Sequence, residues 1–239
     1  MHRLGLLVPS VNTVAEPEFW RLLPADSTLH AARMRNSTCD VNDSYRMLDH
    51  VARAADELGS ANVDVVAFAC TASSFVAGIE GERRLRDQIS TAANAPAVTT
   101  SGAVVEQLRS IGAQRVALYT PYPGELNLHE TRFLAEHGIE TISDHGLGIS
   151  AAVEIADVTS RMLLDLIATN APPITADAIF LSCTNLATMS VIGIVERTYD
   201  LPVLSSNSAT FAAVARQLDW DLPDALGHIA TSAGSTTAS

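Results

Sequence analysis

The chain repeats itself, and this internal duplication limits the folds that are open to it. Two apolar runs, residues 65–69 and 178–181, have the composition of buried strands, and each leads into a Cys-Thr pair, at Cys70 and at Cys183. The two cysteines stand 113 positions apart, and the strand-like segments that begin at Arg3 and Arg115 stand 112 positions apart. Near-equal offsets over such a distance indicate two copies of one supersecondary unit.

Within each copy, short apolar runs alternate with helical patterns, which predicts an α/β fold with parallel strands and helical crossovers. We expect two pseudo-symmetric domains, each a short parallel sheet flanked by helices: residues 1–101 with a returning C-terminal segment, 208–239, and residues 102–207. The expected strands are 4–9, 65–70, 97–98, 115–120, 139–142, 178–182 and 202–205, and the longer expected helices are 43–58, 80–93, 125–137, 151–169 and 208–219. The segment after Ala230 is of low complexity and is expected to be a frayed tail.

The position of the two cysteines predicts a shared site. A buried parallel strand delivers the residue that follows it to the carboxyl edge of the sheet, where α/β proteins bind ligands. Cysteine reacts as the thiolate, which nearby hydrogen-bond donors stabilise. Such donors directly follow the two cysteines in the sequence, at Thr71, Thr184 and Asn185. Either cysteine alone would be an ordinary buried strand-end residue, but the matched pair favours function. Cys39 lies in a polar loop without such a partner, and we expect no direct role for it.

The loops that follow the paired first strands are also candidates for ligand contacts. Ser10 and Asn12 offer a hydroxyl and an amide just before a helix, an arrangement that holds a carboxylate or that simply caps the helix. The spacing of Thr13 and Glu16 predicts a capping box at that helix start. Tyr122 is expected either to donate to a carboxylate or to pack between the halves. Asn185 and Asn207 are weaker candidates of the same kind.

Composition excludes several classes of function. The formal charge is −12 and the chain has no lysine, so a nucleic-acid partner, a phosphate-binding loop with its lysine and a Schiff-base mechanism are all excluded. The three cysteines and seven histidines show no spacing typical of a metal site. We expect cofactor-free chemistry. No apolar run reaches the roughly 20 residues of a membrane span, and the N-terminus is unlike a signal peptide, so a cytoplasmic protein that does not enter the membrane is expected.

Several motifs together carry a family resemblance. They are Pro-Ser-Val-Asn-Thr at residues 9–13 followed by Glu16 and Glu18, Ala-Cys-Thr-Ala-Ser-Ser-Phe at 69–75, Thr-Pro-Tyr at 120–122 and Ser-Cys-Thr-Asn-Leu at 182–186. With these motifs the sequence resembles the aspartate/glutamate racemase superfamily, and within it the maleate cis-trans isomerase branch, which is similar to arylmalonate decarboxylase. The resemblance covers nearly the whole chain, to about residue 228. It implies an active site in the cleft between the domains, no cofactor, a small carboxylic acid as substrate and a homodimer.

The resemblance also implies roles for individual residues. Cys70 would attack an alkene carbon of maleate to give a thioether, in which the central carbon–carbon bond can rotate before elimination releases fumarate. Cys183 would act as acid and base on the neighbouring carbon, or steady the developing enediolate. Asn12 and Tyr122 would hold the carboxylates. Backbone N–H groups beside each cysteine, at Thr71 and Ala72 and at Thr184 and Asn185, would act as oxyanion donors.

One departure from the family pattern keeps other activities open. Maleate isomerases carry a further carboxylate-binding asparagine in the second half, where this chain has Ala152 and Val153. The alternative enzyme is an amino-acid or hydantoin racemase that uses the two thiols as paired acid and base. A relative that decarboxylates arylmalonates keeps only the second-half cysteine, so Cys70 argues against that activity. A further alternative is a non-catalytic accessory protein of a catabolic pathway, which predicts unreactive thiols.

Overall fold

The computed structural model describes residues 1–232 and contains two four-stranded parallel sheets of the same design. The first has the order β2-β1-β3-β4 and the second β6-β5-β7-β8, so each strand of one sheet has a counterpart in the other. The strands are β1 (His2–Pro9), β2 (Ser27–Met34), β3 (Val65–Phe68), β4 (Ala97–Thr99), β5 (Arg115–Thr120), β6 (Glu140–Gly146), β7 (Ala178–Leu181) and β8 (Val203–Ser205). The predicted α/β fold with two similar halves is confirmed.

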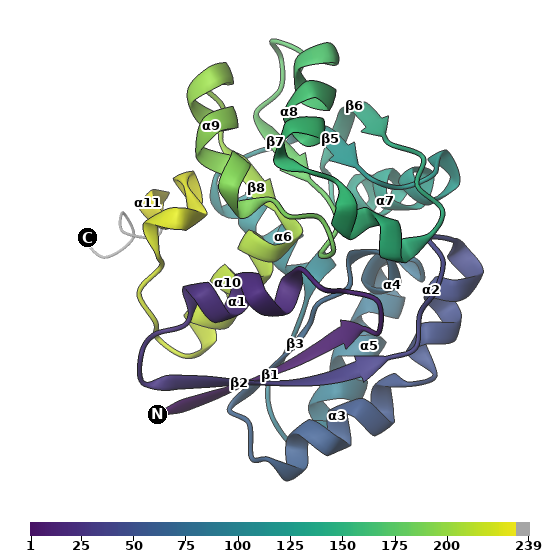
Figure 1. Ribbon diagram of the computed structural model, residues 1–239, viewed down its shortest axis with the longest axis vertical. Helices are drawn as coiled ribbons and strands as arrows, with labels where there is room; N and C mark the ends of the chain where they lie inside the picture. The colour runs from purple at the N-terminus through teal and green to yellow at the C-terminus, as the bar shows by residue number, and fades with distance from the viewer. Residues whose placement is uncertain (233–239) are drawn as a thin grey trace.

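Helices cover both faces of each sheet (Figure 1), which is why the inner strands consist almost entirely of apolar residues. The helices are α1 (Ala15–Leu22), α2 (Val41–Leu48), α3 (Val51–Ser60), α4 (Thr71–Phe75), α5 (Gly78–Ala93), α6 (Thr100–Ser110), α7 (Gly124–Glu136), α8 (Ser160–Thr169), α9 (Met189–Tyr199), α10 (Ser206–Gln217) and α11 (His228–Ser232), with short 3₁₀ helices η1 (Ala152–Asp157) and η2 (Asp224–Leu226). None of the helices in residues 1–232 is both long and apolar enough to cross a bilayer. Most of the predicted frayed tail lies outside the described residues.

Helix α10 connects the two halves. It follows β8 of the second sheet and packs against α6, the helix that follows β4 of the first sheet. Its first ten residues are all buried, and the hydroxyl of Thr210 hydrogen-bonds to the hydroxyl of Thr100 at 3.0 Å. The start of α10 therefore stands between the carboxyl edges of the two sheets, where a site is expected.

Several expected elements differ in the structure. Strand β2 was not expected from the sequence, because its exposed edge position tolerates Thr28, His30 and Arg33 between apolar residues. The helix expected over 43–58 is two helices, α2 and α3, which meet at residues 49–50. The helix expected over 151–169 is η1 followed by α8, because the side chain of Thr159 accepts a hydrogen bond from the N–H of Met162 and begins a new helix.

The predicted capping box at Thr13 and Glu16 is wrong. Helix α1 begins at Ala15, after Val14, and no side chain of the N-cap residue caps it. The Oδ1 atom of Asn12 instead accepts hydrogen bonds from the N–H groups of Val14 and Ala15, at 3.0 and 2.9 Å. Asn12 thus stabilises the helix start from outside the helix, and this fixes its side chain at the edge of the sheet.

Candidate active site

The two cysteines lie on one cavity between the halves. Cys70 follows β3 and Cys183 follows β7, and loops from both halves line the cavity, in which about 40 Å³ is open to the centre of a water-sized sphere. Eight of the predicted site residues line this cavity: Asn12, Cys70, Thr71, Ala72, Tyr122, Cys183, Thr184 and Asn185. Ser10 is not among the lining residues; its hydroxyl donates to the carbonyl of Asn36 and accepts from the N–H of the same residue, both at 3.1 Å.

Cys70 is buried at the start of α4. Burial raises the pKa of its thiol, while hydrogen bonds from the N–H and hydroxyl of Ser73 and from the N–H of Ala72 partly offset that increase. These donors come from the first turn of α4 and face the sulfur. The same donors would stabilise the thiolate once it forms, and they do so without a cationic side chain.

Cys183 has a strained backbone. Its φ angle is +115°, a value that residues other than glycine rarely adopt. The N–H of Cys183 donates to the hydroxyl oxygen of Ser206 at 2.9 Å, which helps to hold this conformation. Burial raises the pKa of the thiol to about 12, against the hydrogen bond from Tyr122 and that from the N–H of Asn185. A charge on Cys70 raises the pKa of Cys183 further, so ionisation of one thiol opposes ionisation of the other.

The threonine after each cysteine hydrogen-bonds to the opposite half. The hydroxyl of Thr71 donates to Ser206 at 2.8 Å, and Ser206 in turn accepts from the N–H of Cys183. The hydroxyl of Thr184 donates to the carbonyl of Ala69, directly before Cys70, at 2.9 Å. Both cysteine loops are therefore fixed relative to each other. Ser206 was not predicted as a site residue, although it directly follows β8 of the second sheet, as Thr100 follows β4 of the first.

Asn12 and Asn185 also bind protein groups, whereas the third candidate asparagine, Asn207, does not line the cavity. The amide nitrogen of Asn12 donates to the hydroxyl of Thr184 at 3.1 Å. The side chain of Asn185 accepts from the N–H of Thr13 and donates to the carbonyl of Ala152, both at 3.0 Å. Each side-chain amide carries two hydrogens, so each retains one hydrogen for a ligand. Burial raises the pKa of Tyr122 well above its usual value, and its hydroxyl keeps the proton that it shares with Cys183.

The roof of the cavity is the segment 36–40, which is bonded to the second half. The N–H of Cys39 donates to the carbonyl of Ser150 at 2.8 Å, and the N–H of Ala152 donates to the carbonyl of Ser37 at 3.2 Å. Cys39 also lines the cavity, although the sequence predicts no direct role for it. Burial raises the pKa of its thiol, and charges on Cys183 and Cys70 raise it further, so all three thiols are within electrostatic range of one another.

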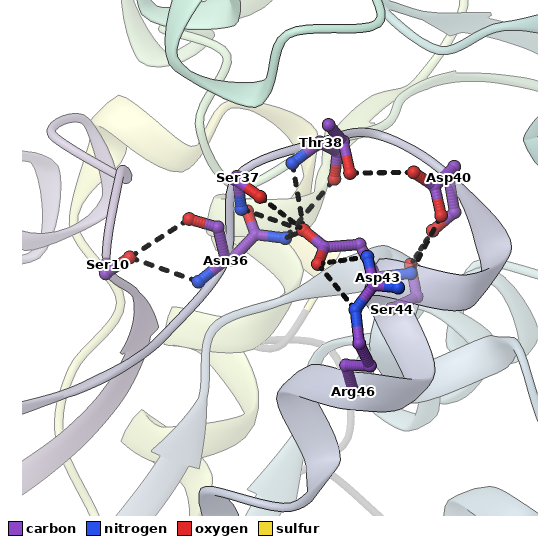
Figure 2. Close-up of polar contacts among 8 residues, drawn as sticks. All are labelled: Ser10, Asn36, Ser37, Thr38, Asp40, Asp43, Ser44 and Arg46. Carbon is purple, nitrogen blue, oxygen red and sulfur yellow. Dashed lines mark hydrogen bonds and ion pairs between the residues drawn. The ribbon is translucent and has the colours of Figure 1, made fainter.

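Asp43 holds this roof segment in shape (Figure 2). Its Oδ2 atom accepts hydrogen bonds from the N–H groups of Ser37 and Thr38 and from the side chain of Asn36, at 2.8 to 2.9 Å. Arg46 donates to Oδ1 at 2.9 Å. Burial alone would raise the pKa of this carboxyl, but the N–H groups and the guanidinium outweigh burial and hold the pKa at about 2. The carboxylate is therefore charged at all physiological pH values.

The lining of the cavity carries little charge. In the part of the chain that the structure describes, no arginine or histidine side chain lines it, and the sequence has no lysine. Hydroxyl, amide and backbone N–H groups are the available donors, and Ala152, Ile155 and Leu126 form an apolar wall. Such a site suits a small carboxylic acid that neutral donors bind, with two thiols in position to act on its carbon atoms.

Comparisons with known proteins agree with this description. The sequence model of a family described as arylmalonate decarboxylase matches residues 4–230. The maleate isomerase of Geobacillus stearothermophilus is 30% identical over 233 residues, which are 91% of this chain and 92% of the relative. A solved maleate isomerase variant from Pseudomonas putida S16 with maleate has a TM-score of 0.91 at 28% identity, covering 97% of this chain and 98% of that one.

A third structure bears on the chemistry. It is a cysteine-to-serine variant of the maleate cis-trans isomerase of Nocardia farcinica with a covalently bound succinylcysteine intermediate. Its TM-score is 0.88 at 25% identity, covering 94% of this chain and 98% of that one.

Proposed function

The chain belongs to the arylmalonate decarboxylase family, and from this premise we propose that it is a cofactor-independent isomerase that converts maleate to fumarate. The observation that carries the proposal is the placement of Cys70 and Cys183, one from each half, on a single cavity. A family member with a succinylcysteine intermediate supports covalent chemistry at such a thiol.

The reaction needs one proton and two sulfur atoms. The Cys70 thiolate adds to one alkene carbon and forms a carbon–sulfur bond, while the Cys183 thiol gives its proton to the neighbouring carbon. The former double bond is now single and rotates. The Cys183 thiolate then takes a proton back from that carbon, the carbon–sulfur bond breaks, and fumarate leaves with Cys70 again a thiolate. The step is redox-neutral, and the thiol pair carries one proton before and after.

Other cavity residues have roles that follow from their contacts. Tyr122 donates to Cys183 and stabilises that sulfur when it is a thiolate. The N–H of Ala72 and the hydroxyl of Ser73 do the same for Cys70. Asn12 and Asn185 bind carboxylates with their remaining amide hydrogens. Negative charge develops on the carboxylate oxygens during addition. The hydrogen-bond donors that stabilise it are already in position before the reaction.

Ala152 supports one alternative substrate class. Ala152 lines the cavity. The family resemblance implies a carboxylate-binding asparagine of maleate isomerases at Ala152 or Val153, so one carboxylate would have a donor fewer here. A racemase acting on a small amino acid or a hydantoin needs the same two thiols, on opposite faces of one acidic carbon, and needs fewer carboxylate donors. The two activities predict different products and are separated by direct assay.

The experiment is a substrate test with defined variants. Purified protein is incubated without cofactor with maleate, and loss of maleate absorbance with appearance of fumarate is expected. Cys70→Ala and Cys183→Ala are each expected to abolish it. In Cys183→Ser, incubation with maleate is expected to leave a covalent adduct on the Cys70 peptide, found by mass spectrometry. Full activity of Cys70→Ser would exclude the covalent route, and racemisation of aspartate, glutamate or a hydantoin without maleate turnover would support the alternative.

Assembly, location and domain limits are further parts of the proposal. We propose a homodimer in the cytoplasm, with domains of residues 1–101 plus 208–239 and 102–207. The packing of α10 against α1, β3 and β4 supports the assignment of this helix to the first domain. Light scattering of the purified protein is expected to give twice the mass of one chain, 25.3 kDa, and the mass of a single chain would refute the dimer.

A further inference from the structure

Two buried glutamates occupy matching positions in the two halves. Glu18 on α1 and Glu130 on α7 stand 112 positions apart, the same offset as the paired first strands. Both are almost fully buried, at 5% and 2% exposure. A buried carboxyl group is costly unless it is hydrogen-bonded or neutral, so each needs an explanation in its contacts.

Glu18 has a full set of partners in the second half. One oxygen accepts from the N–H groups of Thr188 and Met189, at 3.1 and 3.2 Å, and the other accepts from the side-chain amide of Asn207 at 2.7 Å. The same amide donates to the carbonyl of Thr184 at 3.1 Å. Glu18 therefore connects the first half directly to the segment that follows Cys183.

Glu130 has only half of that set. Its Oε1 atom accepts from the hydroxyl of Ser182 at 2.6 Å, but its Oε2 atom is buried without a hydrogen-bond partner among the described residues. The counterpart of Asn207 in the first half is Ser101, which has the same offset, 106, as Pro96 and Pro202. The hydroxyl of Ser101 is likewise buried without a partner among those residues. Serine is shorter than asparagine, so the contact that Asn207 makes to Glu18 is not made here.

A small cavity lies beside both residues. Glu130 and Ser101 line it together with Thr71 and buried phenylalanines of α4, α7 and β7. About 10 Å³ of it is open to the centre of a water-sized sphere, which is close to the least that one water molecule requires. Two of the residues that line it, Glu130 and Ser101, carry the unpaired polar atoms, and the cavity is too small for a larger ligand.

We propose that one buried water occupies this cavity and bridges Glu130 Oε2 to Ser101 Oγ, and that Glu130, held in this way, is a positioning residue for Cys183. The water would connect α7 of the second half to α6 of the first. The Glu18–Asn207 contact connects the two halves directly, and these two residues also hydrogen-bond to the segment that follows Cys183. Glu130 acts through Ser182, which directly precedes the strained residue Cys183.

The charge state of Glu130 gives this arrangement a chemical consequence. Burial raises the pKa of Glu130 to about 8, against the hydrogen bond from Ser182, so the carboxyl is neutral at pH 7 and its Oε2 donates to the water. A negative charge on Glu130 raises the pKa values of Cys183 and Tyr122. The cavity residues from α4, α6 and β7 are uncharged. Cys183 and Tyr122 are therefore the titratable groups that respond when Glu130 ionises.

The first experiment is a high-resolution crystal structure of the wild-type protein and of Ser101→Asn. We expect one water peak within hydrogen-bond distance of Glu130 and Ser101 in the wild type. In Ser101→Asn the amide is expected to replace the water and contact Glu130, as Asn207 contacts Glu18. An empty or collapsed cavity in the wild type would overturn the proposal.

The second experiment measures alkylation of Cys183 by iodoacetamide at pH 7 and pH 9, with peptide mass spectrometry to separate the three cysteines. Glu130→Gln keeps an uncharged hydrogen-bonding group but does not ionise. The rate increase of Glu130→Gln between the two pH values is expected to exceed that of the wild type about threefold, because no charge forms beside Cys183. Glu125→Gln, on the exposed side of the same helix, is the control and should match the wild type.

Equal increases in wild type and Glu130→Gln would overturn the role of Glu130 toward Cys183. That Cys183 takes part in a reaction rests on the proposed function, but neither experiment uses maleate. Absence of maleate turnover would therefore refute the proposed function, while the crystal structures and the alkylation rates would still test the role of Glu130.

Discussion

The replacement Asp43→Asn tests how the roof of the active site is held. Asp43 is 6% exposed, and one of its oxygens accepts three hydrogen bonds of 2.8 to 2.9 Å from the segment 36–38 (Figure 2). Asparagine has nearly the same shape but no charge, and its NH₂ group cannot accept hydrogen bonds. The variant therefore removes the charge-assisted part of these contacts with little change in volume.

The magnitude follows from the pKa of the carboxyl group. Hydrogen bonds and Arg46 outweigh burial and lower this pKa from 3.8 to about 2. A pKa that is lower in the folded than in the unfolded state stabilises the fold above the unfolded pKa, and this stabilisation is lost as the pH falls through the folded pKa. The carboxylate thus contributes about 2 kcal/mol at pH 7, of which about half remains at pH 3.

Urea unfolding of the two proteins at several pH values measures this contribution. Asp43→Asn is expected to lower the free energy of unfolding by about 2 kcal/mol at pH 7 and by about half as much at pH 3. The exposed Asp49→Asn, just after α2, is the control and should lie within about 0.5 kcal/mol of the wild type. A loss that is the same at both pH values, or no loss at pH 7, would refute the reasoning.

Three further predictions concern the cavity and the contacts between the halves. Because burial raises the pKa of Cys70 and the thiolate attacks, kcat/KM for maleate is expected to rise from pH 7 to pH 9, by up to about tenfold per pH unit, and a flat profile in initial-rate assays would contradict this. Glu18→Ala leaves buried donors unpaired and is expected to lower the free energy of unfolding by about 3 kcal/mol in urea titrations, with a smaller loss for Glu18→Gln. Ala152→Asn adds a donor to the cavity wall and is expected to lower the KM for maleate about tenfold; an unchanged KM would show that the added amide does not reach the substrate.

The sequence predicts most of the fold because the duplication and the apolar runs are local signals. Strands β3 and β7 are continuous apolar runs, and a parallel sheet that is covered on both faces requires that pattern. Each Cys-Thr pair directly follows such a run, so each thiol lies at the carboxyl edge of its own sheet. Cys70 and Cys183 meet on a single cavity because the two edges also face each other across the halves.

The features that the sequence does not reveal depend on contacts between distant residues. Cys39 reaches the cavity because Asp43 folds its loop and because its N–H bonds to Ser150, far along the chain. Ser206 reads as an ordinary residue at a helix start, yet it accepts hydrogen bonds from Thr71 and Cys183 of different halves. No periodicity within either segment encodes these partners, because only the packing of the two sheets creates them.

The neutral lining of the cavity has a consequence for how the thiols are used. A cation beside the cysteines would lower their pKa values and bind a dicarboxylate more tightly. It would, however, bind maleate and fumarate as strongly as the addition intermediate, which does not speed the reaction. Neutral donors at Cys70 and Cys183 leave the pKa values high, so little thiolate exists in the empty site. The donors then act mainly on charge that appears during addition. A charge on Cys70 raises the pKa of Cys183, so Cys183 holds the one proton of the pair, gives it to the substrate carbon during addition and takes it back on elimination.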